Sequence, residues 1–157
     1  MSVNIILEGV GDVRRAFEEL ADEIGDKKAT SKILVPAVRE AMKPVLAQAR
    51  LNAPEDTGGL KRSLQVEARR PTRKDKGSKY ISSTDTVISL VTTAPGKKLA
   101  KMGIASDARA IAQEFGSARN PAQPYLRPAL ESQSQKVIDD LAQILARRID
   151  KYNQDRT

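Results

Sequence analysis

The sequence predicts an α+β fold, in which a small antiparallel sheet with a long basic hairpin loop is packed by N-terminal helices and a long C-terminal helix. Three observations predict it: helical apolar stripes near both ends of the chain, two short β-branched segments in its middle, and a polar, basic stretch between them. The 157 residues fit one domain, residues 1–157. With 3% aromatic residues, the core must be built mostly from aliphatic side chains.

The first elements are a short strand and a helix. Val3–Leu7 is apolar and β-branched, which is typical of a strand. Asp12 is expected to cap a helix whose apolar stripe continues to Ile24. Gly25 then stands where a left-handed C-terminal cap would end the helix.

A second helix is expected from Thr30 or Ser31 to about Ala53. Pro44 interrupts it, because a proline cannot donate a hydrogen bond to the carbonyl of Glu40, so a kink is predicted. The proline after Ala53 disfavours helical backbone there and marks the end. The stripe expected to face the core is Leu34, Val38, Ala41, Met42, Val45 and Ala49.

Two strands follow, joined by an unusually long connection. Leu64–Ala68 alternates apolar and polar residues, and Thr86–Thr93 is rich in Val, Ile and Thr. Residues 69–85 between them form the extended hairpin loop, and a loop of this length in a compact domain is typically functional or disordered. The stretch Lys97–Gly103 has no clear pattern.

The net charge of +7 is concentrated in this middle region, since residues 61–101 carry eleven basic and three acidic side chains. Three interpretations stay open: a mobile solvated loop, contact with the phosphates of DNA, or docking on an acidic face of a neighbouring protein. Tyr80 is the only aromatic residue nearby, so stacking on bases is not expected. The candidate contact residues are Arg69, Arg70, Arg73, Lys74, Lys76 and Lys79.

The C-terminal part predicts a short helix, a stiff loop and a long helix. Asp107–Phe115 reads as the short helix, closed by Gly116, and three prolines stiffen residues 120–128. The long helix is expected from about Arg127 to Tyr152, and residues 153–157 are expected to form a disordered tail. Its predicted stripe is Leu130, Val137, Leu141, Ile144, Leu145 and Ile149.

The absence of both Cys and His argues against an enzyme. It excludes disulfides, thiolate nucleophiles, Cys-ligated zinc and the usual general base near neutral pH. Asp56-Thr57-Gly58 matches the aspartic-protease triplet, but it follows a helix instead of a hydrophobic strand. We therefore expect no catalytic residue, metal or cofactor, and the sequence predicts neither a membrane span nor a secretory signal.

Two segments in the same order carry a family resemblance: APEDTGGLKRSL at 53–64, and IAQEFGS at 111–117 followed by PAQPYLRPAL at 121–130. Together they resemble the tail-completion or head–tail joining (neck, minor tail) proteins of lambdoid siphophages. The departures are Ser117 where the family usually has Thr, Tyr125 where it has Phe, and Gly59 where it often has a larger residue. The basic hairpin loop is also longer than the resemblance leads us to expect.

The resemblance implies a structural virion protein, made in the host cytoplasm, that assembles as a homo-oligomeric ring, hexameric like the tail. Implied partners are the tail tube or tail terminator protein, the head connector or head closure protein, and genome DNA. The alternative is a non-specific DNA-binding module acting through residues 69–79.

Two sets of residues follow from this reading. The glycines allow a sharp turn between helix and strand, formed by Asp56, Thr57, Gly58 and Gly59. The second set belongs to a stiff segment that is expected to contact another subunit, with Tyr125 and Leu126 inserted into the core to anchor the last helix; the alternative is that the segment packs only within the chain. Its residues are Gly116, Ser117, Pro121, Pro124, Tyr125, Leu126 and Arg127.

Overall fold

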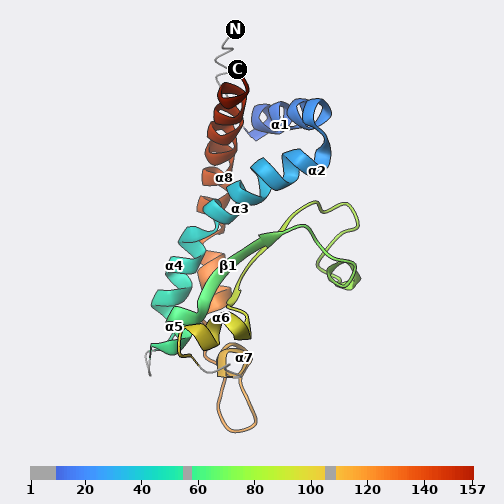
Figure 1. The fold of residues 1–157 in the computed structure, drawn as a ribbon. Helices are drawn as coiled ribbons and strands as arrows, with labels where there is room; N and C mark the ends of the chain where they lie inside the picture. The colour runs from blue at the N-terminus through green and yellow to red at the C-terminus, as the bar shows by residue number, and fades with distance from the viewer. Residues whose placement is uncertain (1–9, 55–57, 105–108) are drawn as a thin grey trace. The chain divides into compact units, whose positions relative to one another are not determined.

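The computed structural model describes residues 10–54, 58–104 and 109–157 (Figure 1). It is mostly helical, with a two-stranded antiparallel sheet and a long C-terminal helix, which confirms the predicted α+β class. The strand predicted at Val3–Leu7 lies outside the described residues. The chain divides into two compact units of interleaved segments: a first unit of residues 1–41, 68–89 and 138–157, and a second of residues 42–67 and 90–137. The single domain expected from the length stays a prediction.

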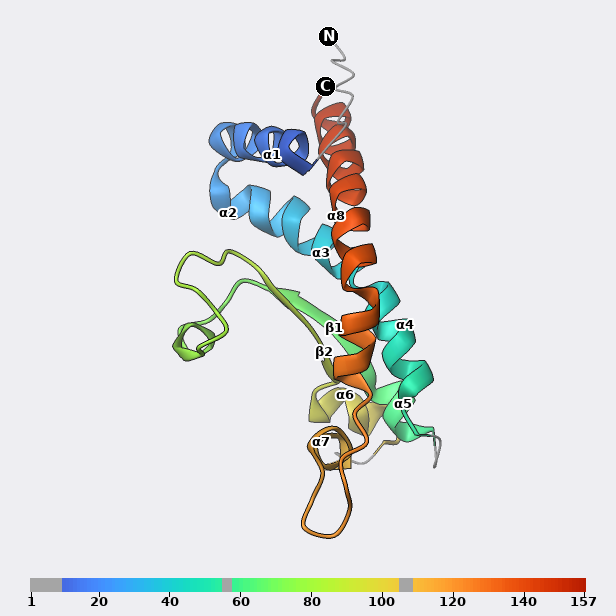
Figure 2. The same ribbon diagram turned by 180° about the vertical axis from the view of Figure 1, so that it is seen from behind.

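The first unit is built from N-terminal helices and the C-terminal half of helix α8 (Figure 2). The helical segments are α1 (Val10–Ile24), α2 (Asp26–Ala29), the π-helical segment η1 (Thr30–Leu34), α3 (Val35–Ala41) and α8 (Leu126–Arg156). Their apolar faces meet in one cluster, as the stripes predict. Its buried members are Ala16, Leu20, Ile33 and Ile149, with Phe17, Ile24, Leu145 and Tyr152 packed around them.

The helix starts in this unit differ from the prediction. Asp12 lies inside α1, which begins at Val10, so Asp12 is not its N-cap. Gly25 ends α1 as predicted, but with φ +93° and ψ +138° its backbone is not the left-handed helical conformation expected of the cap. The chain re-enters a helix at once with Asp26, earlier than the expected Thr30. The π-helical segment η1 follows α2 directly, so the helical path does not restart at Thr30.

The buried face of the second helix is also shifted. Ile33 and Ala37 are buried, whereas Leu34 and Val38 of the predicted stripe are only half-buried. The wider π-helical turn just before Pro36, which has no N–H to donate, changes the angle between successive side chains and so moves the buried face.

The C-terminal end of α8 is helical where a disordered tail was expected. The helix runs through Arg156, beyond the expected end at Tyr152, so the prediction for residues 153–156 is wrong. Arg156 forms an ion pair with Glu23 of α1 and lies 5.6 Å from the centroid of the Tyr152 ring. These contacts with α1 and within α8 favour helix at the last turn.

The described residues of the second unit form most of the sheet and four short helices. Its elements are α4 (Lys43–Asn52), α5 (Gly59–Ser63), most of β1 (Leu64–Arg69) and β2 (Ile88–Thr93), α6 (Gly96–Lys101), α7 (Arg109–Phe115) and the N-terminal part of α8. Met42 precedes α4 and Pro44 lies in its first turn, which confirms the predicted interruption. The core cluster is Met42, Val45, Ala49, Ala53, Leu64, Tyr125 and Ala129.

A two-stranded sheet is marginal alone, so its packing matters. Leu64 is buried in the core cluster of the second unit, and Val66 and Val91 pack against it. Beyond the strands, the loop of residues 70–87 contains the short 3-10 helix η2 (Asp75–Gly77) and projects on the same side as α1 and α2 in both views (Figures 1 and 2).

One residue of the predicted α8 stripe is not in the core. Leu130 is 49% exposed, while the neighbouring Ala129 is fully buried and occupies the core position instead. The small side chain of Ala129 fits the core cluster of the second unit at this position. The predicted register of the apolar stripe was therefore wrong by one residue at the N-terminal end of α8.

Candidate partner-binding surfaces

The loop between α7 and α8 is the first candidate surface. Every residue from Ser117 to Pro124 is exposed, and the two segments that flank the loop, α7 and the N-terminal part of α8, belong to the second unit. Figure 1 shows this loop projecting beyond α7. We call residues Ser117–Pro124 the proline loop.

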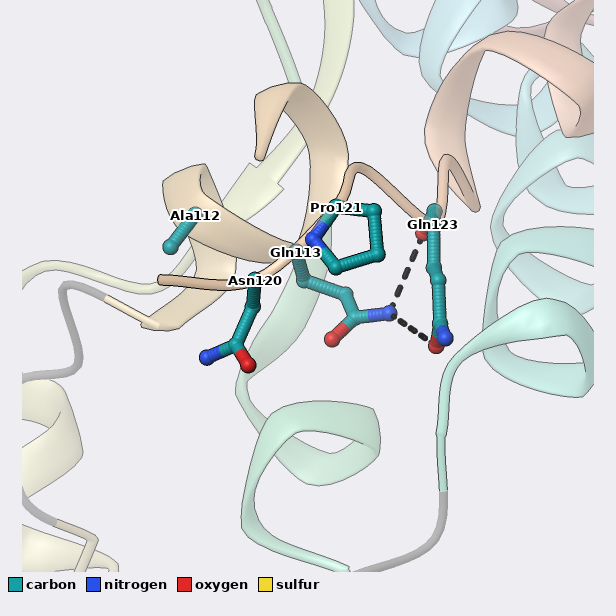
Figure 3. A pocket seen from close by; sticks show the side chains of 5 residues that line it. All are labelled: Ala112, Gln113, Asn120, Pro121 and Gln123. Atoms are coloured by element: carbon teal, nitrogen blue, oxygen red, sulfur yellow. Dashed lines mark hydrogen bonds between the residues drawn. The ribbon is translucent and has the colours of Figure 1, made fainter. Parts of the chain in front are cut away.

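The base of the proline loop is closed by a glutamine pair. The backbone N–H of Gln123 donates to the carbonyl of Gln113 at 2.9 Å. The Gln113 side-chain amide returns two hydrogen bonds, to the backbone carbonyl of Gln123 at 3.2 Å and to its side-chain oxygen at 3.1 Å (Figure 3). A pocket lined by these two residues and by Ala112, Asn120 and Pro121 lies beside the pair.

The tip of the proline loop is a tight turn. Ser117 donates its N–H to the carbonyl of Asn120 at 2.9 Å, and its hydroxyl accepts from the N–H of Asn120 at 3.2 Å. Gly116 has φ +81°, and a Cβ there would lie 2.9 Å from the backbone nitrogen of Ala122. Both the backbone conformation and the close approach therefore require glycine at position 116.

A buried carboxylate joins the proline loop to α8. Glu114 is 7% exposed and accepts the backbone N–H groups of Tyr125, Leu126 and Arg127 at 2.8, 2.9 and 3.0 Å. These groups open α8 and have no partner inside the helix, and the helix dipole favours a negative charge beside them. Glu114 thus caps α8 from α7.

The same contacts determine the protonation of Glu114. Burial raises the pKa of its carboxyl, but the three backbone N–H donors and the charge of Arg127 outweigh burial and leave the pKa below its ordinary value. The group is therefore an anion throughout the neutral range, as a helix cap requires.

Tyr125 and Leu126 pack inside the second unit, as the sequence predicts. Tyr125 is 1% exposed, and its hydroxyl donates to the carbonyl of Ala110 at 3.4 Å. Asn52 of α4 donates to the Tyr125 carbonyl at 3.4 Å, and Leu126 packs against the same core. Of the seven predicted contact residues, four are exposed: Ser117, Pro121, Pro124 and Arg127.

The glycine turn is described only in part. Asp56 and Thr57 lie outside the described residues. Gly58 has φ +72° and precedes α5, and Gly59 is the first residue of that helix. The left-handed backbone at Gly58 is one that glycine adopts readily. It leads into the short helix α5, which lies between Gly58 and β1, so the chain does not pass directly from the turn into the strand as predicted. Helix α4 precedes the turn, as predicted, whereas the Asp-Thr-Gly triplet of an aspartic protease follows a hydrophobic strand.

The second candidate surface is the hairpin loop, where five cations are exposed: Arg70, Arg73, Lys74, Lys76 and Lys79. Arg69 differs from them, because its guanidinium binds both carboxylate oxygens of Asp75. Thr72 donates its N–H and its hydroxyl to Asp75 at 2.7 and 2.6 Å. The hydrogen bond from Arg69, followed by those from Thr72, holds the pKa of Asp75 well below its ordinary value.

Comparison with known proteins decides the family. Residues 12–116, well over half of the 157, match the model of the family described as "Bacteriophage HK97-gp10, putative tail-component". The chain belongs to this family of phage tail components. The match includes the glycine turn, the hairpin and α7, and it ends where the proline loop begins. No curated protein and no solved structure matches the chain.

This tail component has a further surface that the sequence did not indicate. Leu51, 75% exposed, and Met102 lie together in a groove bordered by Arg50, Lys61 and Arg62. Because α4, α5 and the end of α6 contribute these residues from distant points in the sequence, only the fold brings them together.

Within residues 10–54, 58–104 and 109–157, no group of three or more acidic side chains could hold a metal ion. No helix in those ranges is both long and apolar enough to cross a membrane.

Proposed function

We propose that this tail component is a tail-completion or head–tail joining subunit. Copies form a closed ring, six-fold like the tail, at the end of the tail, where the ring contacts the tail tube or tail terminator protein and the head connector or head closure protein. Membership of the tail-component family supports a place in the tail. The resemblance of the motifs at 53–64 and 111–130 to tail-completion proteins supports a role at the junction between tail and head.

The observation that carries the proposal is the combination of exposure and order in the proline loop. All eight residues are exposed, yet the Gln113–Gln123 pair and the Glu114 cap hold both ends of the loop. A loop that is already ordered loses little conformational entropy when a partner binds. Such a loop suits an assembly whose energy comes from binding and symmetry alone.

Deletion of the gene in its phage tests this role. We expect DNA-filled heads alongside complete tails that fail to attach, seen by negative-stain electron microscopy. Normal, infectious particles from the deletion would contradict the proposal.

A single charge reversal tests the proline loop itself. Arg119→Glu changes an exposed side chain at the loop tip, so the melting temperature should stay unchanged while the complementation titre of the deletion phage falls at least about tenfold, as expected for an arginine in an interface. Lys43→Glu is the matched control, because Lys43 is exposed in the first turn of α4, where a carboxylate suits the helix dipole. Equal titres for both variants would show that the proline loop is not part of the interface.

A further inference from the structure

We infer that the tip of the hairpin binds the phosphate backbone of duplex DNA without sequence preference. The basic tip is defined by its five exposed cations: Arg70, Arg73, Lys74, Lys76 and Lys79. The inference goes beyond tail joining and does not depend on it.

The first step is the charge that the basic tip presents to solvent. Between Arg70 and Lys79 the only acidic residue is Asp75, and its carboxylate is already bound by Arg69 and Thr72. Arg69 lies at the end of β1, outside the tip, so its charge offsets that of Asp75. Against the five cations of the tip, the rest of the loop of residues 70–87 contributes one acidic residue, Asp85. Clustered positive charge of this kind is the electrostatic basis of sequence-independent DNA binding.

The second step is the order of the loop. Asp75 receives four hydrogen bonds from Arg69 and Thr72, and the N–H of Lys76 donates to the carbonyl of Thr72 at 3.1 Å. The backbone that carries Arg73, Lys74 and Lys76 is thus a fixed turn at the end of a hairpin. Cations on a fixed turn reach neighbouring phosphates at a smaller entropic cost than cations on a flexible chain.

The composition of the basic tip favours DNA over an acidic protein surface as its partner. The centre of a protein interface is apolar and depleted in lysine, whereas three of the five cations are lysines and Tyr80 is the one large apolar side chain among them. Tyr80 is 82% exposed, but the Lys79 ammonium lies 4.9 Å from its ring centroid, over one face. A single, partly covered ring makes a poor stacking platform, which favours backbone contacts with a duplex over base contacts with a single strand.

The test is fluorescence anisotropy of a labelled duplex with the purified full-length protein, over a series of salt concentrations. Five phosphate contacts predict a slope of log K against log salt of up to about −4.5, a loss of about 500-fold between about 50 and 200 mM salt. Arg73→Gln with Lys74→Gln should reduce the slope by about 1.8, with no difference between duplexes of unrelated sequence. The matched control, Lys27→Gln with Lys28→Gln, removes two exposed charges from α2 and should leave the slope unchanged.

Three results would overturn the inference: no salt-dependent binding, equal effects of the two double variants, or loss of association between copies in the loop variant without any DNA binding. The last would assign the basic tip to an acidic protein face. Circular dichroism checks that both variants fold. The first two results do not bear on the joining role, which the deletion phage tests separately.

Discussion

At the scale of single residues, Glu114 is the side chain on which the loop geometry depends. It lies 11 residues before Tyr125 and 13 before Arg127, yet its carboxylate binds the backbone of both. Local capping signals place a polar side chain directly before a helix, and here Pro124 and Tyr125 occupy those positions. The sequence predicted a short helix ending at Gly116 and a buried Tyr125. The cap by Glu114 could not be predicted, because only the fold brings its carboxylate to the start of α8.

Glu114→Gln tests the cap. The amide keeps one acceptor oxygen but loses the charge and one of the acceptor sites, so we expect the free energy of unfolding to fall by about 2 kcal/mol. Urea denaturation followed by circular dichroism measures it. Glu131→Gln, on the exposed face of α8, should change stability by less than about 0.5 kcal/mol. Equal effects of the two substitutions would show that the capping bonds contribute nothing.

The lowered pKa of Glu114 adds a pH dependence. A carboxyl whose pKa is lower in the folded than in the unfolded state stabilises the fold above its unfolded pKa, and this stabilisation is lost as the pH falls through the folded pKa. The stability difference between wild type and Glu114→Gln should therefore shrink when the pH is lowered from about 6 to about 3. A difference that stays constant over this range would contradict the assignment.

At the scale of elements, the sequence predicted the helices and strands whose bounds depend on a local feature, such as a proline or an alternation of apolar and polar residues. Proline positions explain why α4 starts after Met42 and why it ends at Asn52, and the alternation from Leu64 explains β1. Helices α5 and α6 were missed, because each is short and has no apolar stripe. The π-helical turn at η1 also has no sequence pattern, and it shifted the buried face of α3.

The order of the hairpin loop is also an element-level property that the sequence left open. Asp75→Asn should weaken the bonds from Arg69 and Thr72 that fix the turn, so trypsin should cut within residues 70–79 at least about tenfold faster. Asp22→Asn, on the exposed face of α1, should leave the rate unchanged. Equal cleavage rates in wild type and Asp75→Asn would mean that the loop is not held by this aspartate.

At the scale of the whole molecule, the interleaving of the two units could not be predicted. Helix α8 and both strands contribute to each unit, so no linker or composition change marks a division along the chain. The motifs were nevertheless sufficient for the family, because they lie in turns whose glycines and prolines have backbone roles: Gly58 and Gly116 both adopt positive φ. The exposed groove at Leu51 and Met102 depended on the fold alone.

The most direct test of the central claim is electron cryomicroscopy of intact phage particles at a resolution that traces side chains. We predict a closed ring of this chain between the tail tube and the head connector, with residues 117–124 at a contact between subunits or with the tube. Finding the chain elsewhere in the virion, or finding the ring with this loop facing only solvent, would contradict it.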